Sequence, residues 1–163
     1  MTDAHFTEAL FTESDGAFMR RALELAQQGE ALGEVPVGAV VVAEGKIIGE
    51  GFNCPISQND PTAHAEVMAL RDAASRISNY RLENTTLYVT LEPCTMCVGA
   101  LVHARVARVV FAASEPKAGS LQSARRQLES GYYNHVFRFE SGLLGEEAGA
   151  MLSQFFRKRR LEK

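Results

Sequence analysis

One histidine and two cysteines, carried by two separate segments of this chain, restrict its fold more than any other feature. His64 begins the segment His-Ala-Glu, and Cys94 and Cys97 form a C-x-x-C pair directly after a proline. An imidazole nitrogen and two thiolates are a ligand set that Zn²⁺ favours, and protein zinc sites are usually tetrahedral. The fold must therefore bring the two segments together, and three protein ligands leave the fourth position open for chemistry.

Glu66 supplies what a hydrolytic zinc site needs besides the metal. It lies two positions after His64, where it can stand beside the metal without binding it. Zinc lowers the pKa of water from about 15.7 to about 7, and a carboxylate placed to move protons adds roughly 10²–10⁴-fold in rate. H-x-E combined with P-C-x-x-C is a known signature of zinc-dependent nucleobase deaminases. We predict one zinc per chain, held by His64, Cys94 and Cys97, with Glu66 as the catalytic residue.

Two other interpretations of the cysteines remain open at this point. A C-x-x-C pair after an apolar segment is also typical of thioredoxin-like redox dithiols. A closed structural zinc site would recruit Cys54 or His103 as its fourth ligand. The redox interpretation leaves His64 and Glu66 unexplained, and the structural zinc leaves Glu66 without a role.

Both ligand segments have the features of helix starts. Asp60-Pro61-Thr62 has the pattern of a cap with proline in the first turn, and Pro93 precedes Cys94. Helix N-termini directed at the metal would lower the pKa values of the cysteines.

Apolar periodicity predicts helices alternating with strands after an opening hairpin. The expected elements are a flexible leader over 1–13, a helix capped by Ser14 and Asp15 and ending near Gly29, strands over 37–42 and 46–52, a helix after His64 with Val67, Leu70, Ala74 and Ile77 on one face, a strand over 87–91, a helix after Cys94, strands over 106–111 and 136–140, and a closing helix over 143–159. This order predicts a single α/β domain over 1–163, a three-layer α/β/α sandwich around a five-stranded mixed sheet.

Composition is typical of a compact intracellular enzyme. The 163 residues, of which 46% are hydrophobic, can form a core without disulfides. Three cysteines, two of them assigned to metal, fit a reducing compartment. The chain has neither a signal-like start nor an apolar stretch long enough to cross a bilayer. We therefore expect a cytoplasmic protein without membrane contact.

Charge is distributed unevenly along the chain. The net charge is −3, yet residues 1–34 alone carry seven acidic side chains against two arginines, so the remainder is positive. Residues 157–163 hold five basic side chains and one acidic one. Such a cluster either complements the dipole of a last helical turn or contacts nucleic-acid phosphates, with Phe155 or Phe156 available to stack on a base.

Several segments together resemble the bacterial tRNA-specific adenosine deaminases, which have a cytidine deaminase-like fold. They are Asp60 to Glu66, Thr90 to Cys97, Val35 to Ala39, Tyr133 to His135 and Phe155 to Arg160. The resemblance implies a homodimer with one zinc per subunit. It also implies deamination of adenosine to inosine at the wobble position of an arginine tRNA anticodon, so that a tRNA anticodon stem-loop is the expected partner.

Further site residues follow from that resemblance. The amide of Asn53 offers a donor and an acceptor to a purine edge, although an asparagine after a strand is also a common turn residue. The resemblance favours the binding role. It further implies that Val35 and Ala65 line the base pocket, and that Asn134 and His135 contact flanking nucleotides. Candidates for the RNA backbone are Phe156, Arg157, Arg159 and Arg160.

Two other functions remain open. A deaminase of free cytidine, deoxycytidylate or guanine would keep the same four zinc-site residues but would not need the basic C-terminus. A non-enzymatic RNA-binding protein with a structural zinc would bind tRNA and release no ammonia.

Overall fold

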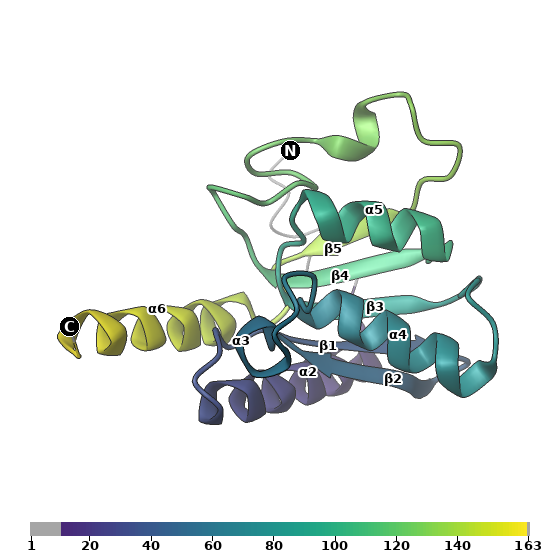
Figure 1. The fold of residues 1–163 in the computed structure, drawn as a ribbon. Helices are drawn as coiled ribbons and strands as arrows, with labels where there is room; N and C mark the ends of the chain where they lie inside the picture. Colours follow the sequence, from purple (N-terminus) through teal and green to yellow (C-terminus); the bar gives the residue numbers. More distant parts are fainter. Residues whose placement is uncertain (1–10, 163) are drawn as a thin grey trace.

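The computed structural model describes residues 11–162, which form one five-stranded mixed sheet with helices on both faces (Figure 1). The strand order is β2-β1-β3-β4-β5; β1 pairs antiparallel with β2 and β3, whereas β4 runs parallel to both β3 and β5. The strands are β1 (Gly38–Ala43), β2 (Lys46–Phe52), β3 (Thr86–Leu91), β4 (Arg108–Ala113) and β5 (Arg138–Ser141). The predicted mixed sheet is therefore confirmed.

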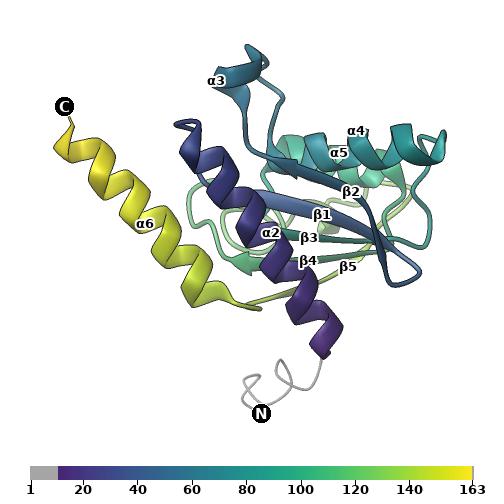
Figure 2. The ribbon, with the colours of Figure 1, turned by 90° about the horizontal axis from the view of Figure 1, so that it is seen from below.

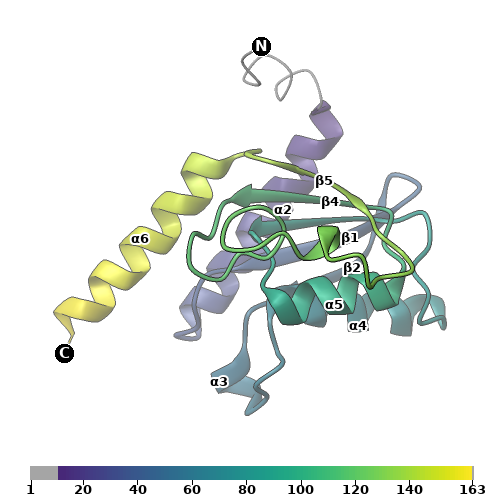
Figure 3. The same cartoon turned by 90° about the horizontal axis from the view of Figure 1, so that it is seen from above.

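Two helices cover each face of the sheet. Helices α2 (Glu13–Ala31) and α6 (Gly145–Leu161) lie on one side (Figure 2), and α4 (Ala65–Ile77) and α5 (Thr95–Ala104) lie on the other (Figure 3). Each side has its own cluster of buried apolar residues. The predicted three-layer sandwich is confirmed. Among the described residues, every helix is too short or too polar to cross a membrane.

Strand β1 is apolar because both of its faces are covered. Ala39 and Val41 belong to the core under α4 and α5, whereas Val40 and Val42 belong to the core under α2. A strand buried on both faces is a continuous apolar run, as the sequence Gly-Ala-Val-Val-Val-Ala is.

Helix α4 packs closely against the edge strand β2 because that strand carries glycines. A Cβ on Gly49 would lie 2.5 Å from the carbonyl oxygen of Ala69, so no side chain fits there. The helix accordingly buries a small-residue face made by Ala65, Ala69 and Ala73, with Leu70 beside it. Of the predicted face, Leu70 is buried and Ala74 packs partly buried against the same core. Val67 is only half-buried and Ile77 is 43% exposed, so the prediction is wrong for Ile77.

Several element boundaries differ from those predicted. Helix α2 is capped by Thr12, whose hydroxyl accepts from the backbone N–H of Asp15 while the Asp15 carboxylate accepts from that of Thr12. This capping box replaces the predicted caps at Ser14 and Asp15. The predicted leader over 1–13 is therefore wrong for Thr12 and Glu13, and residues 1–10 lie outside the described residues. Helix α6 ends at Leu161, two residues later than predicted, and the short helices α3 (Pro55–Gln58) and η1 (Gln127–Glu129) were not predicted.

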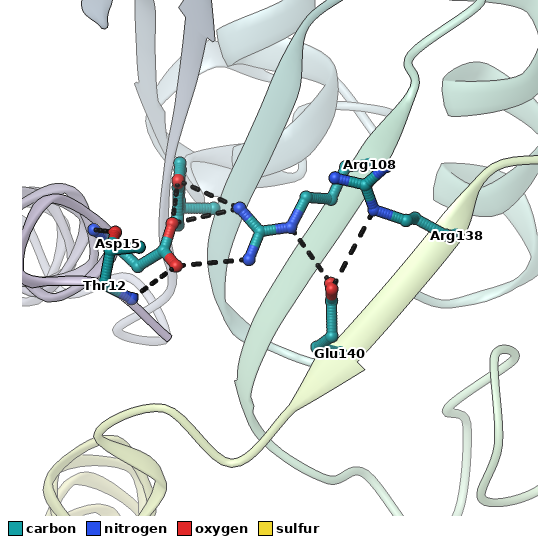
Figure 4. A network of polar contacts seen from close by, with 6 residues as sticks. Thr12, Asp15, Arg108, Arg138 and Glu140 are labelled. Atoms are coloured by element: carbon teal, nitrogen blue, oxygen red, sulfur yellow. Dashed lines mark hydrogen bonds and ion pairs between the residues drawn. The ribbon is translucent and has the colours of Figure 1, made fainter. Parts of the chain in front are cut away.

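A buried ionic network joins α2 to the start of β4 (Figure 4). The Arg108 guanidinium donates to both oxygens of Asp15 at 3.0 and 3.2 Å, and also to Glu140 at 3.1 Å. The hydroxyl of Tyr88 donates to Asp15 as well. Burial raises the pKa of Asp15, but the hydrogen bonds from Arg108, Tyr88 and Thr12 outweigh it and lower the pKa to about 2. Strands β3, β4 and β5 and helix α2 are therefore fixed to one another at this end.

We predict that Asp15→Asn lowers the free energy of unfolding by about 2–4 kcal/mol, because it removes one of the two carboxylates that pair with the buried Arg108. The stabilisation by Asp15 is complete above its ordinary pKa of 3.8 and is lost as the pH falls through about 2. The free energy of unfolding, measured with urea, should therefore fall more for the parent than for the variant between pH 3.8 and about pH 2. Arg20→Ala, which breaks an exposed ion pair with Glu147, should change little. Equal effects of both substitutions would contradict the role of the network.

Candidate active site

The candidate site lies at one end of the strands of the sheet, where β2 and β3 end and β1 begins. We call this end of the strands the metal edge. Strand β3 ends at Leu91, and the chain passes through Pro93 to Cys94, the N-cap of α5. Strand β1 begins beside it, since the backbone N–H of Gly38 donates to Thr90. Strand β2 ends there too, and the following segment leads to His64, the N-cap of α4. Both ligand segments thus reach the same edge, as the motif spacing requires.

The geometry of His64, Cys94 and Cys97 fits a zinc ion. His64 Nδ1 lies 3.5 Å from each of the two sulfurs, and the three ligand atoms all lie within 4.8 Å of one another. With tetrahedral bonds of about 2.1 Å to nitrogen and about 2.3 Å to sulfur, the nitrogen–sulfur separation is about 3.6 Å. These side chains are therefore arranged to hold Zn²⁺.

Both helices direct their N-termini at the ligands. His64 and Cys94 occupy N-cap positions, yet neither side chain caps its helix. An N-cap side chain normally accepts from the first-turn N–H groups; here it points to the metal position instead. The positive ends of both helix dipoles then favour thiolate and other negative charge at this point. Helix α4 begins at Ala65, so the predicted cap at Asp60 is wrong. The Asp60 carboxylate instead accepts hydrogen bonds from the backbone N–H and the hydroxyl of Thr62 within a turn.

The Cys97 thiol donates a hydrogen bond to the Cys94 sulfur, so the pKa values of the two thiols differ. A hydrogen bond from Cys97 lowers the pKa of Cys94 to about 4, and the same contact raises the pKa of Cys97. The hydrogen bond to the Cys94 sulfur also raises the pKa of His64. A bound cation would instead lower the pKa of both thiols, so that both sulfurs bind it as thiolates.

Glu66 lies beside the ligands in the first turn of α4 and is 5% exposed. Burial raises the pKa of its carboxyl group to about 7, and the negative charge of Cys94 adds to the rise. A carboxyl group with a pKa near neutrality is suited to both take and give a proton.

Neither alternative fourth ligand takes part in the site. Among the described residues, the metal-binding group consists of His64, Cys94 and Cys97. Cys54 is buried outside it, at the N-cap of α3, where its backbone N–H donates to the carbonyl of Ala63. His103 lies in the last turn of α5, at the far end of the helix from Cys94. The closed structural zinc site is thus not formed.

The predicted base-pocket residues gather at the same edge. Asn53 follows β2; its backbone N–H donates to the carbonyl of Val37, and its side-chain amide to that of Val35 at 3.4 Å. Ala65 is fully buried at the start of α4, next to His64. Val35, Asn53 and Ala65 therefore lie at the same end of the strands as the metal ligands.

Asn134 and His135 lie at the opposite edge. They precede β5, which runs parallel to β4, so they reach the end of the sheet at which β4 begins. The imidazole Nε2 of His135 lies 3.0 Å from the carbonyl oxygen of Val106, and Asn134 accepts a hydrogen bond from Arg105. The structure does not bring these two residues to the metal ligands.

The C-terminal helix approaches the site from the side of α2 (Figure 2). A cavity of about 370 Å³ is bounded by base-pocket candidates on one side and by α6 on the other. It is lined by Glu34, Val35, Asn53, Pro55, Ile56, Phe155, Phe156, Arg159 and Arg160. Arg159 donates to the carbonyl of Gly33 at 2.7 Å and lies over the Phe155 ring. The other RNA-backbone candidates, Phe156, Arg157 and Arg160, are exposed.

Two buried glutamates near the site were missed from the sequence. Glu34 is 1% exposed and accepts from the backbone of Ile56 and Ser57, so it fixes α3 against the segment that carries Val35. Glu92 is 3% exposed and lies between β3 and Pro93. A glutamate next to P-C-x-x-C was a usable signal for Glu92; no comparable signal marks Glu34.

Comparison with known proteins identifies the class. Residues 12–113 match the cytidine and deoxycytidylate deaminase zinc-binding region. With three metal ligands, a buried carboxylate and this mixed sheet, the chain is a zinc-dependent deaminase with a cytidine deaminase-like fold.

Individual relatives show to which family of zinc-dependent deaminases the chain belongs. The tRNA-specific adenosine deaminase of Haemophilus influenzae is 56% identical over 153 residues, or 93% of this chain and 88% of the relative. That of Bacillus subtilis is 44% identical over 149 residues, or 91% and 92%. A solved structure from work on A-to-I editing by tRNA:A34 deaminases at the wobble position of transfer RNA has a TM-score of 0.82 and 39% identity, and covers 83% of this chain and 99% of the other. The chain belongs to the tRNA-specific adenosine deaminase family.

We predict one zinc per chain in the parent, in Cys54→Ser and in Glu66→Ala, and loss of zinc in Cys97→Ser. Cys54 and Cys97 are both buried thiols, but only Cys97 faces the imidazole of His64. Metal analysis of the purified variants, with circular dichroism as a check on folding, measures this. Loss of zinc from Cys54→Ser, or its retention by Cys97→Ser at the parent's level, would contradict the assigned ligands.

Proposed function

We propose that this protein deaminates adenosine to inosine at the wobble position of an arginine tRNA anticodon in the cytoplasm. The observation that carries the proposal is the cavity of about 370 Å³ between the metal edge and α6. It joins Val35 and Asn53 to Phe156 and Arg160. A substrate that fills both parts needs a base near the metal and further nucleotides along the helix.

Glu66 is the proposed proton carrier. His64, Cys94 and Cys97 would hold zinc, which would act as a Lewis acid that makes water nucleophilic at neutral pH. Glu66 would accept a proton from the attacking water and deliver it to the ring nitrogen of the base. It would then take the second proton from the hydroxyl left on the ring carbon and pass it to the amino group, which departs as ammonia. The amide of Asn53 holds the purine edge, and Val35 and Ala65 exclude water around the base.

The basic residues of α6 divide into two kinds. Arg159 is held by Gly33 and Phe155, so it anchors the helix against the end of α2. Arg157 and Arg160 are exposed and suited to phosphate contacts. Phe156 is 44% exposed on the cavity wall, where an aromatic ring can stack on an unpaired base. We therefore assign the backbone contacts to Arg157 and Arg160, with Phe156 between them and the base pocket.

The proposed assembly is a homodimer with one zinc per subunit. An apolar depression of about 290 Å³ between α4 and α5, lined in part by Val67, Leu70, Ala74 and Ala100, supports a contact with a second copy. Tyr80 at its rim is 71% exposed. Native mass spectrometry measures the number of subunits and of metal ions together.

We predict that the double variant Arg157→Ala/Arg160→Ala weakens binding of an arginine tRNA anticodon stem-loop. Its slope of log affinity against log salt should flatten by about 1.5, because two fewer phosphates are neutralised. Truncation of residues 157–163 should flatten it at least as much with zinc unchanged. Arg20→Ala is the matched control and should leave the slope unchanged, because Arg20 is an exposed arginine near the middle of α2 that pairs with Glu147 in the first turn of α6.

Free adenosine should be a poor substrate, because it lacks the flanking nucleotides whose binding holds the base in place. Rapid deamination of free adenosine or cytidine, with no effect of the truncation, would instead indicate a nucleoside deaminase.

A further inference from the structure

A buried carboxylate two residues before Cys94 organises the loop that follows β4. Glu92 is 3% exposed, and its carboxylate accepts four backbone hydrogen bonds from this loop. Oε1 accepts from Glu115 at 3.0 Å; Oε2 accepts from Leu121, Gln122 and Ser123 at 3.2, 2.8 and 3.0 Å. The hydroxyl of Ser123 also donates to Oε1. Hydrogen bonds to an ionised acceptor are the strong kind, so this one carboxylate holds both ends of the loop.

The loop over residues 114–123 is fitted closely around this carboxylate. A Cβ on Gly119 would lie 2.5 Å from the backbone carbonyl oxygen of Glu115 and 2.4 Å from the carboxyl carbon of Glu92, so only glycine fits there. Beyond it, the backbone N–H of Ser120 donates to the carbonyl of Pro93 at 2.8 Å, and the hydroxyls of Ser120 and Thr95 lie 2.9 Å apart. The loop is thus bonded to the residues on both sides of the metal ligand Cys94.

The same loop lies at the metal edge of the sheet. It leaves the end of β4, which runs parallel to β3, so both strands end on the side where Cys94 begins α5 (Figure 1). Its exposed residues include Lys117 and Gln122, whose side chains can contact phosphate and base edges. A displacement of the loop would therefore alter the surroundings of a bound nucleotide without removing a metal ligand.

We propose that Glu92 is a positioning residue: its carboxylate sets the place of loop 114–123 beside the metal and thereby the affinity for the RNA substrate. This role rests on the proposed function. It is distinct from the roles of Glu66 and of the metal ligands, because both carboxylate oxygens of Glu92 accept hydrogen bonds from the loop.

The donor arrangement predicts a graded response to substitution. In Glu92→Gln, the amide oxygen should take the place of Oε2, where three N–H groups converge, and the NH₂ group should take that of Oε1. The Ser123 hydroxyl can turn to accept there, but the N–H of Glu115 cannot. Glu92→Gln should therefore release only the Glu115 end of the loop, whereas Glu92→Ala should release both ends.

The test measures zinc content, backbone amide exchange, and KM and kcat on the stem-loop. Relative to the parent, Glu92→Ala should keep one zinc and exchange its amides at 121–123 faster. Its KM should rise by about 10- to 100-fold with kcat nearly unchanged, because the loop's contacts hold the substrate alike in the ground state and the transition state and lost hydrogen bonds to charged groups have effects of this size. Glu92→Gln should show a smaller rise, with faster exchange at 115. Asp15→Asn, which alters another buried carboxylate near the opposite edge, should leave KM unchanged.

Two results would overturn the proposal: parent-like exchange at 115 and at 121–123 in both Glu92 variants, or an equal rise in KM in Asp15→Asn. If Glu92→Ala does not fold, Glu92→Gln decides by the same criteria. A parent that does not deaminate the stem-loop would refute the proposed function; the exchange rates would then decide alone whether Glu92 holds the loop.

Discussion

The metal ligands can meet only if two helices begin at the same edge of one sheet. His64 and Cys94 are the N-caps of α4 and α5, so the separation of their donor atoms depends on how those helices pack on the strands. Gly49 and Gly51 let the backbone of α4 approach β2 closely, and the buried apolar face of α5 packs in the same core. The ligand geometry is thus a consequence of the sheet and its small residues, and the buried Glu66 follows from the same helix start.

Local patterns were sufficient for much of the fold and for the metal site. The apolar strand 87–91 was predicted to within one residue of β3 (Thr86–Leu91), because a buried strand is apolar throughout. The ligands were predictable because zinc chemistry restricts which residue types serve at which spacing. Asp60-Pro61 misled the prediction of the α4 start, because an aspartate caps a turn by the same hydrogen bonds as it caps a helix.

Features that depend on distant partners were not predictable. The buried face of α4 consists of alanines because the helix lies close against the glycines of β2. The apolar periodicity of α4 alone does not contain this information and favoured a face with larger side chains. Asn134 and His135 were assigned near the substrate, yet the direction of β5 places them at the opposite edge. The anchoring of Arg159 by Gly33 depends on the approach of α6 to α2. Glu34 and Glu92 bind backbone N–H groups, and a sequence does not reveal which loop will fold around a carboxylate.

The central claim is that the metal edge deaminates a base presented by RNA, and position-resolved mass spectrometry of an arginine tRNA anticodon stem-loop tests it most directly. Incubation with the zinc-loaded protein should convert the wobble adenosine alone to inosine, with a mass increase of about 1 Da. The Glu66→Ala protein, which lacks only the proton carrier, should leave it unchanged; the loss expected is about 10²-fold or more. Unmodified RNA after incubation with the parent protein, or equal conversion by Glu66→Ala, would contradict the account.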